Sequence, residues 1–328
     1  MVKLAEGVQG FDTTKSAESY ARLNSIGYDT SVKAIVDKMT LFLKNIKGHA
    51  WIVEIGAGQR KATIGIDASL KKHGFSNVTI IPLEPSSEQT KMAPKVDSGD
   101  QSTPPLIRNG EILPIKTNSA KGFLSSQVLH WVTTSKKLLE LFKEGSRILV
   151  KDGFLVHAVS GLVDLKEYNK YHFTRAPFYL EAYLPEVKKL LIEHGFWSED
   201  QGEFVPWNHK VNPFYHKYTL HDIRKIIKKA GFKDVKIDIY FARLGPEEWK
   251  KRCAELSMLK MHLFKSKRLK EIPENLMEEI GKQAFEQAKL SRSDLWNELS
   301  QETSEVMNQM PENLTHGEPV PVITARKK

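Results

Sequence analysis

The stretch "WIVEIGAGQRKAT", residues 51–63, constrains the fold of this chain more than any other segment. Its first five residues, 51–55, are apolar except for Glu54, which is typical of a buried strand. Gly56 and Gly58 follow at once, and a run compatible with a helix comes next. Because glycines let the backbone approach a ligand closely, a strand, a glycine turn and a helix in this order predict a nucleotide-type binding site.

Strands and helices alternate on both sides of this stretch. Residues 16–46 read as a helix, since apolar residues recur there at intervals of three and four. Alternation of this kind predicts an α/β fold, with a mostly parallel sheet covered by helices on both faces. The further strands that we expect lie in "VTIIPLE" (78–84), "EILPI" (111–115), "GFLSSQ" (122–127), "RILVKDGFLVHAVS" (147–160), the strand within 219–244 and "EPVPVITARKK" (318–328); amphipathic helices lie in 61–74, in "SKKLLELFKEG" (135–145, closed by its glycine) and at the start of 219–244.

The alternation breaks at residue 162. Residues 168–218 hold 13 of the 30 aromatic residues of the chain, and residues 246–309 read as wholly helical. We therefore expect residues 1–161 to form N-terminal helices and the cofactor-binding half of the sheet domain. The aromatic-rich segment 162–218 would be an inserted substrate lid, with an ordinary helical cap that has its own core as the alternative. Residues 219–328 would complete the sheet domain, with 246–309 as a helical insertion.

Composition limits the cellular setting and the partners. A single cysteine, Cys253, excludes an internal disulfide, and no apolar run of about 18 residues indicates a membrane span. No apolar segment typical of a secretory signal is present, so we expect a cytoplasmic protein. We expect the protein to be a monomer or a homodimer. The net charge of +9 is spread over many helices, which favours solvated faces over a nucleic-acid surface. Four histidines in the aromatic-rich segment lack the spacing of metal ligands, so we expect no metal site.

Two cofactor classes use a glycine turn after a strand. A dinucleotide site needs a third glycine or alanine, and here Gly56 and Gly58 are followed by Gln59, Arg60 and Lys61. An acid two residues before the first glycine fits better. The sequence Glu54-x-Gly56-x-Gly58 resembles motif I of the class I S-adenosylmethionine-dependent methyltransferases.

Further segments resemble the same family, in the order that it requires. "PLEPS" places Glu84 at the end of the second strand, where the family's acid accepts hydrogen bonds from both ribose hydroxyls. "NGEILPI" (109–115) resembles the element before the fourth strand of the family, and "EGSRILVKDGFLV" (144–156) resembles the turn before the fifth. Within this family the chain resembles the type 11 methyltransferase domains, and the resemblance covers residues 51–156. It implies a Rossmann-like sheet with an antiparallel last strand, and S-adenosylmethionine as the cofactor.

The resemblance also implies the residues that hold the cofactor. The turn would contact the methionine end, Glu84 the ribose and Asn109 the adenine. The cofactor-binding residues expected on this basis are Tyr20, Glu54, Gly56, Ala57, Gly58, Glu84, Pro85, Asn109, Gly110, Ser125 and Ser126. The chain departs from the family pattern at Arg60, where the motif has its third glycine, and at Asn109, where aspartate is usual.

The segment "SSQVLHWV" (125–132) bears on the methyl acceptor. It resembles the same place in small-molecule carboxyl methyltransferases, namely the plant SABATH family, insect juvenile hormone acid methyltransferase and trans-aconitate methyltransferase. In SABATH members the matching tryptophan donates to the substrate carboxylate, and "ESYARLNS" resembles their start, which places Tyr20 over the cofactor. The residues expected to act on or bind the acceptor are His130 and Trp131, with Gln127, Tyr171 and Phe178.

These features predict a methyltransferase acting on a small, partly apolar acceptor through a carboxylate or another oxygen. Packing under the sheet edge is the structural alternative for His130 and Trp131. A second enzymatic hypothesis moves the methyl group to an amine or carbon of a natural product, with His130 as the base. A third is an RNA-associated or inactive methyltransferase-like subunit, in which Arg60 would mark an eroded site and the lysines would contact phosphates.

Overall fold

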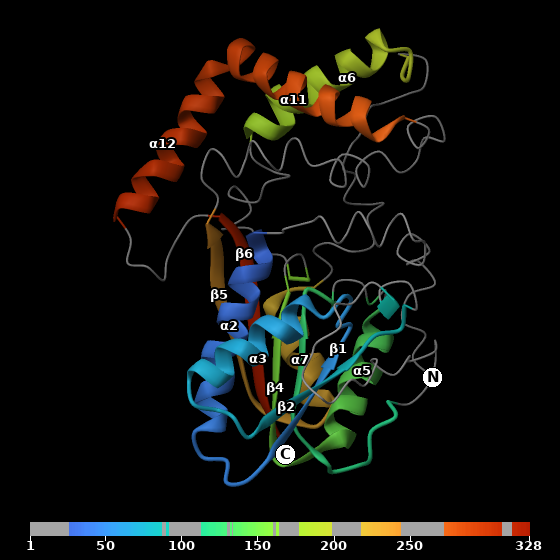
Figure 1. The fold of residues 1–328 in the computed structure, drawn as a ribbon, viewed down its shortest axis with the longest axis vertical. Coiled ribbons are helices and arrows are strands. Elements are labelled where there is room, and N and C mark those ends of the chain that lie inside the picture. The colour runs from blue at the N-terminus through green and yellow to red at the C-terminus, as the bar shows by residue number, and fades with distance from the viewer. Residues whose placement is uncertain are drawn as a thin grey trace. The chain divides into compact units, whose positions relative to one another are not determined.

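The computed structural model describes residues 26–86, 90–91, 113–129, 132, 134–159, 162–163, 177–198, 218–243, 272–309 and 317–328. The chain divides into two compact units. The first is drawn from residues 1–164, 213–240 and 320–328, and the second from residues 165–212 and 241–319. Figure 1 shows the elements of both.

The first unit is built on a six-stranded sheet in the order β2-β1-β3-β4-β6-β5. Its central strand pairs, β1 with β2, β1 with β3 and β3 with β4, are parallel, whereas β6 runs antiparallel to β4. This confirms the predicted Rossmann-like sheet, including a last strand that inserts beside its neighbour. The strands are β1 (Ala50–Ile55), β2 (Val78–Leu83), β3 (Ala120–Ser126), β4 (Leu149–Ala158), β5 (Phe232–Arg243) and β6 (Gly317–Lys327).

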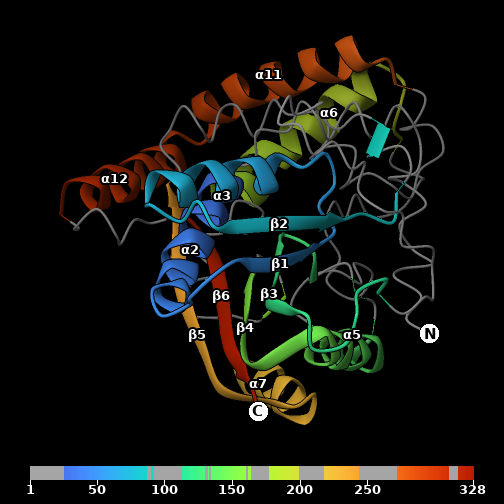
Figure 2. The same cartoon turned by 60° about the horizontal axis from the view of Figure 1, so that its bottom comes forward.

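Helices cover both faces of this sheet (Figure 2). On one face α2 (Ile26–Leu43) packs against α3 (Lys61–Lys72) and β4, and on the other α5 (Ser135–Ile148) packs against α7 (Leu220–Lys229). The α2 face is held by apolar burial, which is the main favourable contribution to folding. Its buried cluster comprises side chains of α2 (Ala34, Ile35, Val36, Met39, Leu43), α3 (Ala62, Ile66, Leu70) and the strands (Ile52, Leu124, Phe154, Val156 and others).

The predicted helix over 16–46 is confirmed over α2, Ile26–Leu43, whereas residues 44–46 have already left the helix. The helix predicted to end at Gly74 ends two residues earlier, at Lys72, and Gly74 takes the left-handed conformation with φ 85°. A left-handed residue just after a helix is the usual way to terminate it, and glycine adopts it without a steric penalty.

The prediction that Gly145 closes the helix after residue 135 is wrong. Helix α5 continues to Ile148, and the Leu149 amide still bonds back to the Gly145 carbonyl. A Cβ on Gly145 would lie 2.4 Å from Cδ1 of Phe123 on β3, so the missing side chain makes room for that ring. Gly145 is therefore a close-packing residue inside the helix, and tertiary packing outweighs its low helix propensity.

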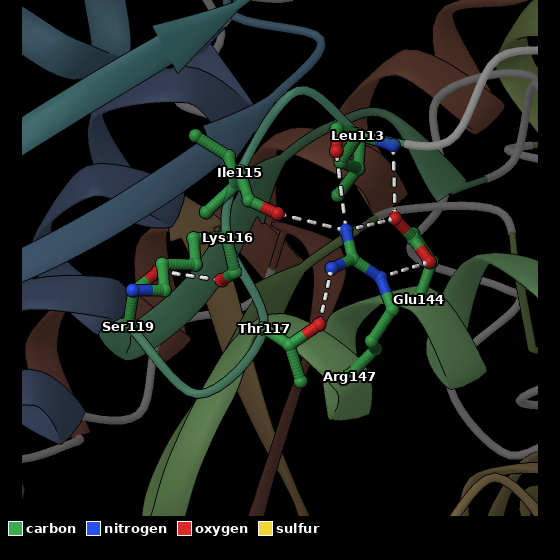
Figure 3. Close-up of polar contacts among 7 residues, drawn as sticks. All are labelled: Leu113, Ile115, Lys116, Thr117, Ser119, Glu144 and Arg147. Atoms are coloured by element: carbon green, nitrogen blue, oxygen red, sulfur yellow. Dashed lines mark hydrogen bonds and ion pairs between the residues drawn. The ribbon is translucent and has the colours of Figure 1, made fainter.

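The predicted strand "EILPI" is also wrong for its described part, Leu113 to Ile115, which forms a bend. Figure 3 shows the reason: the Arg147 guanidinium donates to the carbonyls of Leu113 (3.1 Å) and Ile115 (2.9 Å), which therefore do not enter a sheet ladder. Pro114 between them has no N–H to donate to a ladder. Glu144 completes the cluster by accepting from Arg147 and, at 2.9 Å, from the Leu113 amide.

The second unit is helical in its described part, apart from the end of β5 and the start of β6. It contains the π-helical segment η4 (Phe178–Tyr183), α6 (Leu184–Glu193), α11 (Glu274–Ser291) and α12 (Ser293–Gln309), and α6 packs along α11 (Figures 1 and 2). Its core includes a group of rings in which Phe178 contacts Phe285 and Trp296, with ring centroids 5.7 and 5.2 Å away. In the part of the chain that the structure describes, no helix combines the length and the apolar character needed to cross a membrane.

Candidate active site

The site begins where β1 ends and the chain turns into α3. Gly56, Gly58 and Arg60 all have left-handed backbones, with φ of 63°, 54° and 63°. Such a run lets the turn reverse within a few residues. A hydrogen bond to the neighbouring strand holds the turn in place: the Ala57 amide donates to the Leu83 carbonyl of β2 at 3.1 Å. The predicted strand, glycine turn and helix are thus confirmed.

The turn also lies tightly against the segment that follows β3. A Cβ on Gly56 would lie 2.6 and 2.7 Å from the two methyl carbons of Val128, so only glycine fits without movement. Because β1 and β3 are parallel neighbours, their carboxyl ends meet at one edge of the sheet. The structure therefore brings together the glycine turn and the start of "SSQVLHWV".

Glu84 joins two backbone segments at this edge. Its Oε2 accepts a hydrogen bond from the Gly58 amide at 2.7 Å, and its Oε1 accepts one from the Ser86 amide at 2.8 Å. The side chain is buried, with 6% of its surface exposed. Because an ionised carboxylate has acceptor positions for about four hydrogen bonds, one group can hold the turn and accept from a ribose. Pro85 follows it and is half-buried.

Glu54 lies beneath the turn and is fully buried. Thr63, in the first turn of α3, donates to its Oε2 at 2.6 Å. Burial raises the pKa of Glu54 to about 7, against the opposing effects of the Thr63 hydrogen bond and the charge of Arg60, while the charge of Glu84 raises it further. Glu54 therefore titrates near neutral pH, and a neighbouring cation would favour its ionised form.

A small cavity of about 10 Å³ lies beside Glu54, lined by Glu54, Gly56, Ala57, Gln59, Lys61, Ala62 and Ser126. This is the space of one water-sized group. The hydroxyl of Ser126 is buried and has no hydrogen-bond partner among the described residues. Since a buried hydroxyl without a partner costs free energy, the cavity suits a polar ligand group. An ammonium, directly or through one water, fits a site made of a carboxylate and a hydroxyl.

The pKa of Glu54 gives a prediction for cofactor binding. Glu54 is increasingly ionised as the pH rises through 7, and only the ionised form attracts an ammonium. The affinity for S-adenosylhomocysteine should therefore increase about tenfold between pH 6 and pH 7.5, by the titration of a single group. Isothermal calorimetry across this range should show the rise in the native chain and a weak, pH-independent affinity in Glu54→Gln.

The control for this measurement is Asp67→Asn. Asp67 lies on the same helix α3 but is exposed and paired with Lys71 at 2.7 Å, four residues on. Its variant should keep the native pH dependence. If the affinity of the native chain does not change over this range, Glu54 does not contact the ammonium.

Ser125, the neighbour of Ser126, points elsewhere. Its Oγ lies 2.6 Å from Nδ1 of His157 on β4, and both residues are fully buried. Burial lowers the pKa of His157 to about 3, so this imidazole is neutral at physiological pH. The rings of Phe123 and Phe142 lie against it, at 5.2 and 5.7 Å between centroids. This pair holds the end of β3 to β4.

Gln127 follows β3 with a left-handed backbone, φ 54°. Its amide bonds to the Ala158 carbonyl at 2.7 Å, and its Nε2 donates to the Ser31 hydroxyl on α2, also at 2.7 Å. The carboxamide is thus held by the same edge of the sheet as the turn. Its role in binding the acceptor stays a prediction.

The described residues bring together six of the predicted cofactor-binding positions at the ends of β1, β2 and β3: Glu54, Gly56, Ala57, Gly58, Glu84 and Ser126. Phe178 belongs to the second unit and is buried in its ring cluster, with 1% exposed. The predicted residues that lie outside the described residues are Tyr20, Asn109, Gly110, His130, Trp131 and Tyr171. Their roles stay predictions, as does that of Phe178.

Sequence reasoning missed two polar side chains that fix the site. Thr63 could have been found, because the first turn of a helix after a glycine turn lies next to the end of the preceding strand. His157 gave no signal, since it lies 32 residues from Ser125 and only the pairing of β3 with β4 brings them together. Only the partner of His157 is set by the pairing of strands in the sheet.

Comparison with known proteins identifies one domain in the chain. Residues 53–157 match the model of a methyltransferase domain. A search of curated proteins gave no match. Similar solved structures include a phosphoethanolamine N-methyltransferase from Haemonchus contortus (14% identity, 96% of this chain and 57% of that chain covered, TM-score 0.41). A methyltransferase from Archaeoglobus fulgidus (14%, 90% and 95%, 0.40) and the geranyl diphosphate C-methyltransferase of Streptomyces coelicolor (11%, 100% and 88%, 0.41) are others.

These three likenesses have TM-scores below 0.5 and decide nothing about the acceptor. The matched segment runs from the middle of β1 to the end of β4 and so contains the glycine turn, Glu84 and Ser126. The buried acid, the orphan hydroxyl and the strand-end carboxylate fit the charges and hydroxyls of a sulfonium nucleoside that carries an amino-acid end. Residues 53–157 of this chain are therefore a methyltransferase domain, and the site at its strand ends suits S-adenosylmethionine as the cofactor.

Proposed function

We propose that this methyltransferase acts on a small, partly apolar acceptor through a carboxylate or another oxygen. The observation that carries the proposal is the segment "SSQVLHWV", whose first two residues end β3 and whose next residues leave it at the same edge as the glycine turn. The cofactor supplies the methyl group on a sulfonium, which is already a good electrophile. The protein then has to orient the acceptor and exclude water.

A carboxylate acceptor suits these residues because it is ionised at neutral pH and needs no base. It needs donors that leave one oxygen directed at the methyl group. We assign this role to the indole N–H of Trp131, with His130 as a neighbouring donor and Gln127 beside them. The net charge of +9 would help to attract an anion.

The direct test is transfer of label from methyl-labelled cofactor to a panel of small acids, phenols and amines. Base-labile products from the acids would support the proposal. Label that enters amines or carbon alone would contradict it and favour the second hypothesis. Its further mark is a rate at saturating cofactor that falls on acidification, because a protonated His130 can no longer act as the base. Steeply salt-dependent RNA binding without transfer would favour the RNA-associated subunit.

Trp131→Phe gives a sharper prediction for the acceptor. Phenylalanine keeps an aromatic ring at this position but lacks the indole N–H donor. The KM for the accepted acid should therefore rise about 10- to 100-fold, the value of one hydrogen bond to a charged group. The affinity for S-adenosylhomocysteine should not change. Trp51→Phe is the control, since Trp51 lies on β1 with 46% of its surface exposed. An unchanged KM in Trp131→Phe would remove the assigned role.

A further inference from the structure

Arg60 occupies the backbone position where the turn favours glycine. It precedes the first residue of α3 and has φ 63° and ψ 15°, a left-handed conformation that penalises a side chain with a Cβ. The neighbouring left-handed positions of the same turn, Gly56 and Gly58, are both glycines. Strained residues persist where the surrounding structure imposes them, and they concentrate at binding sites. The arginine at this position, within the turn of the site, is therefore a candidate for a binding role.

The surroundings of Arg60 are charged and partly closed. Its charge acts on Glu54, whose pKa it lowers against the larger effect of burial. Its Nε is buried and has no hydrogen-bond partner among the described residues. The residues on either side of it in the chain, Gln59 and Lys61, line the cavity beside Glu54, together with Ser126.

The site thus combines two kinds of charge within one turn. Glu54 offers a carboxylate, while Arg60 and Lys61 bring cations to the beginning of α3, where the positive end of the helix dipole also favours an anion. A ligand group that pairs with both kinds of charge is a zwitterion. Its ammonium would pair with Glu54 and its carboxylate with Arg60 and Lys61. An α-amino acid end has this arrangement of charges.

We propose that Arg60 binds the carboxylate of the amino-acid end of the cofactor, and that this binding is why an arginine stands where the turn favours glycine. The inference deepens the cofactor assignment and rests on it. Arginine suits the role because its planar guanidinium can give two parallel hydrogen bonds to a carboxylate. On this basis Arg60 is a cofactor-binding residue and does not mark an eroded site.

The test compares three nucleosides by calorimetry on the full chain. S-adenosylhomocysteine has the carboxylate, its decarboxylated analogue lacks only that group, and 5′-methylthioadenosine lacks the whole amino-acid end. Arg60→Gly suits the left-handed backbone, so this variant should fold. It should bind S-adenosylhomocysteine about 10- to 100-fold more weakly, the range for charge-assisted hydrogen bonds. At a pH well above 7, where Glu54 is ionised with or without the charge of Arg60, its affinities for the other two nucleosides should equal those of the native chain.

Asp234→Gly is the matched control. Asp234 also has a left-handed backbone, φ 53°, but lies just inside β5. This variant relieves the same kind of backbone strain and should bind all three nucleosides as the native chain does. Arg60→Lys keeps the charge and loses the paired donors, so its affinity for S-adenosylhomocysteine should fall between those of the native chain and Arg60→Gly.

The possible results distinguish failure of the role proposed for Arg60 from failure of the cofactor assignment on which it rests. If Arg60→Gly weakens S-adenosylhomocysteine and its decarboxylated analogue equally, or leaves both unchanged, Arg60 acts only on Glu54 or on the backbone and the inference is wrong. The methyltransferase assignment would survive that result. If the native chain binds none of the three nucleosides, the assignment itself fails, and the inference fails with it.

Discussion

Gly56→Ala is expected to destabilise the chain by about 2–5 kcal/mol and to remove measurable binding of S-adenosylhomocysteine. Two physical effects add. A left-handed backbone costs a residue with a Cβ about 1–2 kcal/mol. The new methyl group would also lie 2.6 Å from a methyl carbon of Val128, and overpacking of this kind costs about 1–3 kcal/mol. Any movement that relieves the contact displaces either the turn or the segment after β3, and both form the site.

The chain contains a matched control for this substitution. Gly48 also has a left-handed backbone, φ 77°, but a Cβ there would have no atom within 4 Å. Gly48→Ala should therefore cost only the backbone term, about 1–2 kcal/mol. Urea unfolding of both variants measures the difference, and calorimetry should show unchanged cofactor binding in Gly48→Ala. Equal costs for the two variants would mean that the turn does not lie against Val128.

Glu84→Gln is expected to weaken binding of S-adenosylhomocysteine by about 100-fold or more. The carboxylate accepts from the amides of Gly58 and Ser86, and the assigned ribose would add its own hydroxyls. A carboxamide of the same shape can offer only one oxygen, so its NH2 group would face one of these two amide donors. Each hydrogen bond to a charged group contributes about 1.5–3 kcal/mol, and 1.36 kcal/mol corresponds to a factor of ten.

The control for Glu84→Gln is Glu278→Gln. Glu278 lies on α11 in the second unit and pairs with Lys282 across one helical turn, with both side chains largely exposed. Loss of this pair should change stability by only a few tenths of a kcal/mol and leave cofactor binding intact. A native affinity in Glu84→Gln would show that the carboxylate neither holds the turn nor accepts from the cofactor.

Much of the first unit was predictable because its signals are local. Burial on both faces makes parallel strands read as continuous apolar runs, and amphipathic helices show their period directly. The acid at the end of β1 and the acid at the end of β2 were predictable as a pair, because parallel strands bring their carboxyl ends to one edge. The errors arose where a long-range contact outweighed a local preference, as Phe123 does at Gly145 and Arg147 does at Leu113.

The sequence by itself determined the strand, glycine turn and helix, the order of the elements and the acids that end two strands, since each depends on residues close together in the chain. Tertiary structure alone decided that Glu54 is buried enough to titrate near neutral pH and that the buried Ser126 hydroxyl has no partner in the part of the chain that the structure describes. It also decided that an arginine takes a left-handed backbone just before α3 begins. The reason is physical: burial, electrostatic environment and strain depend on which distant segments the sheet brings together.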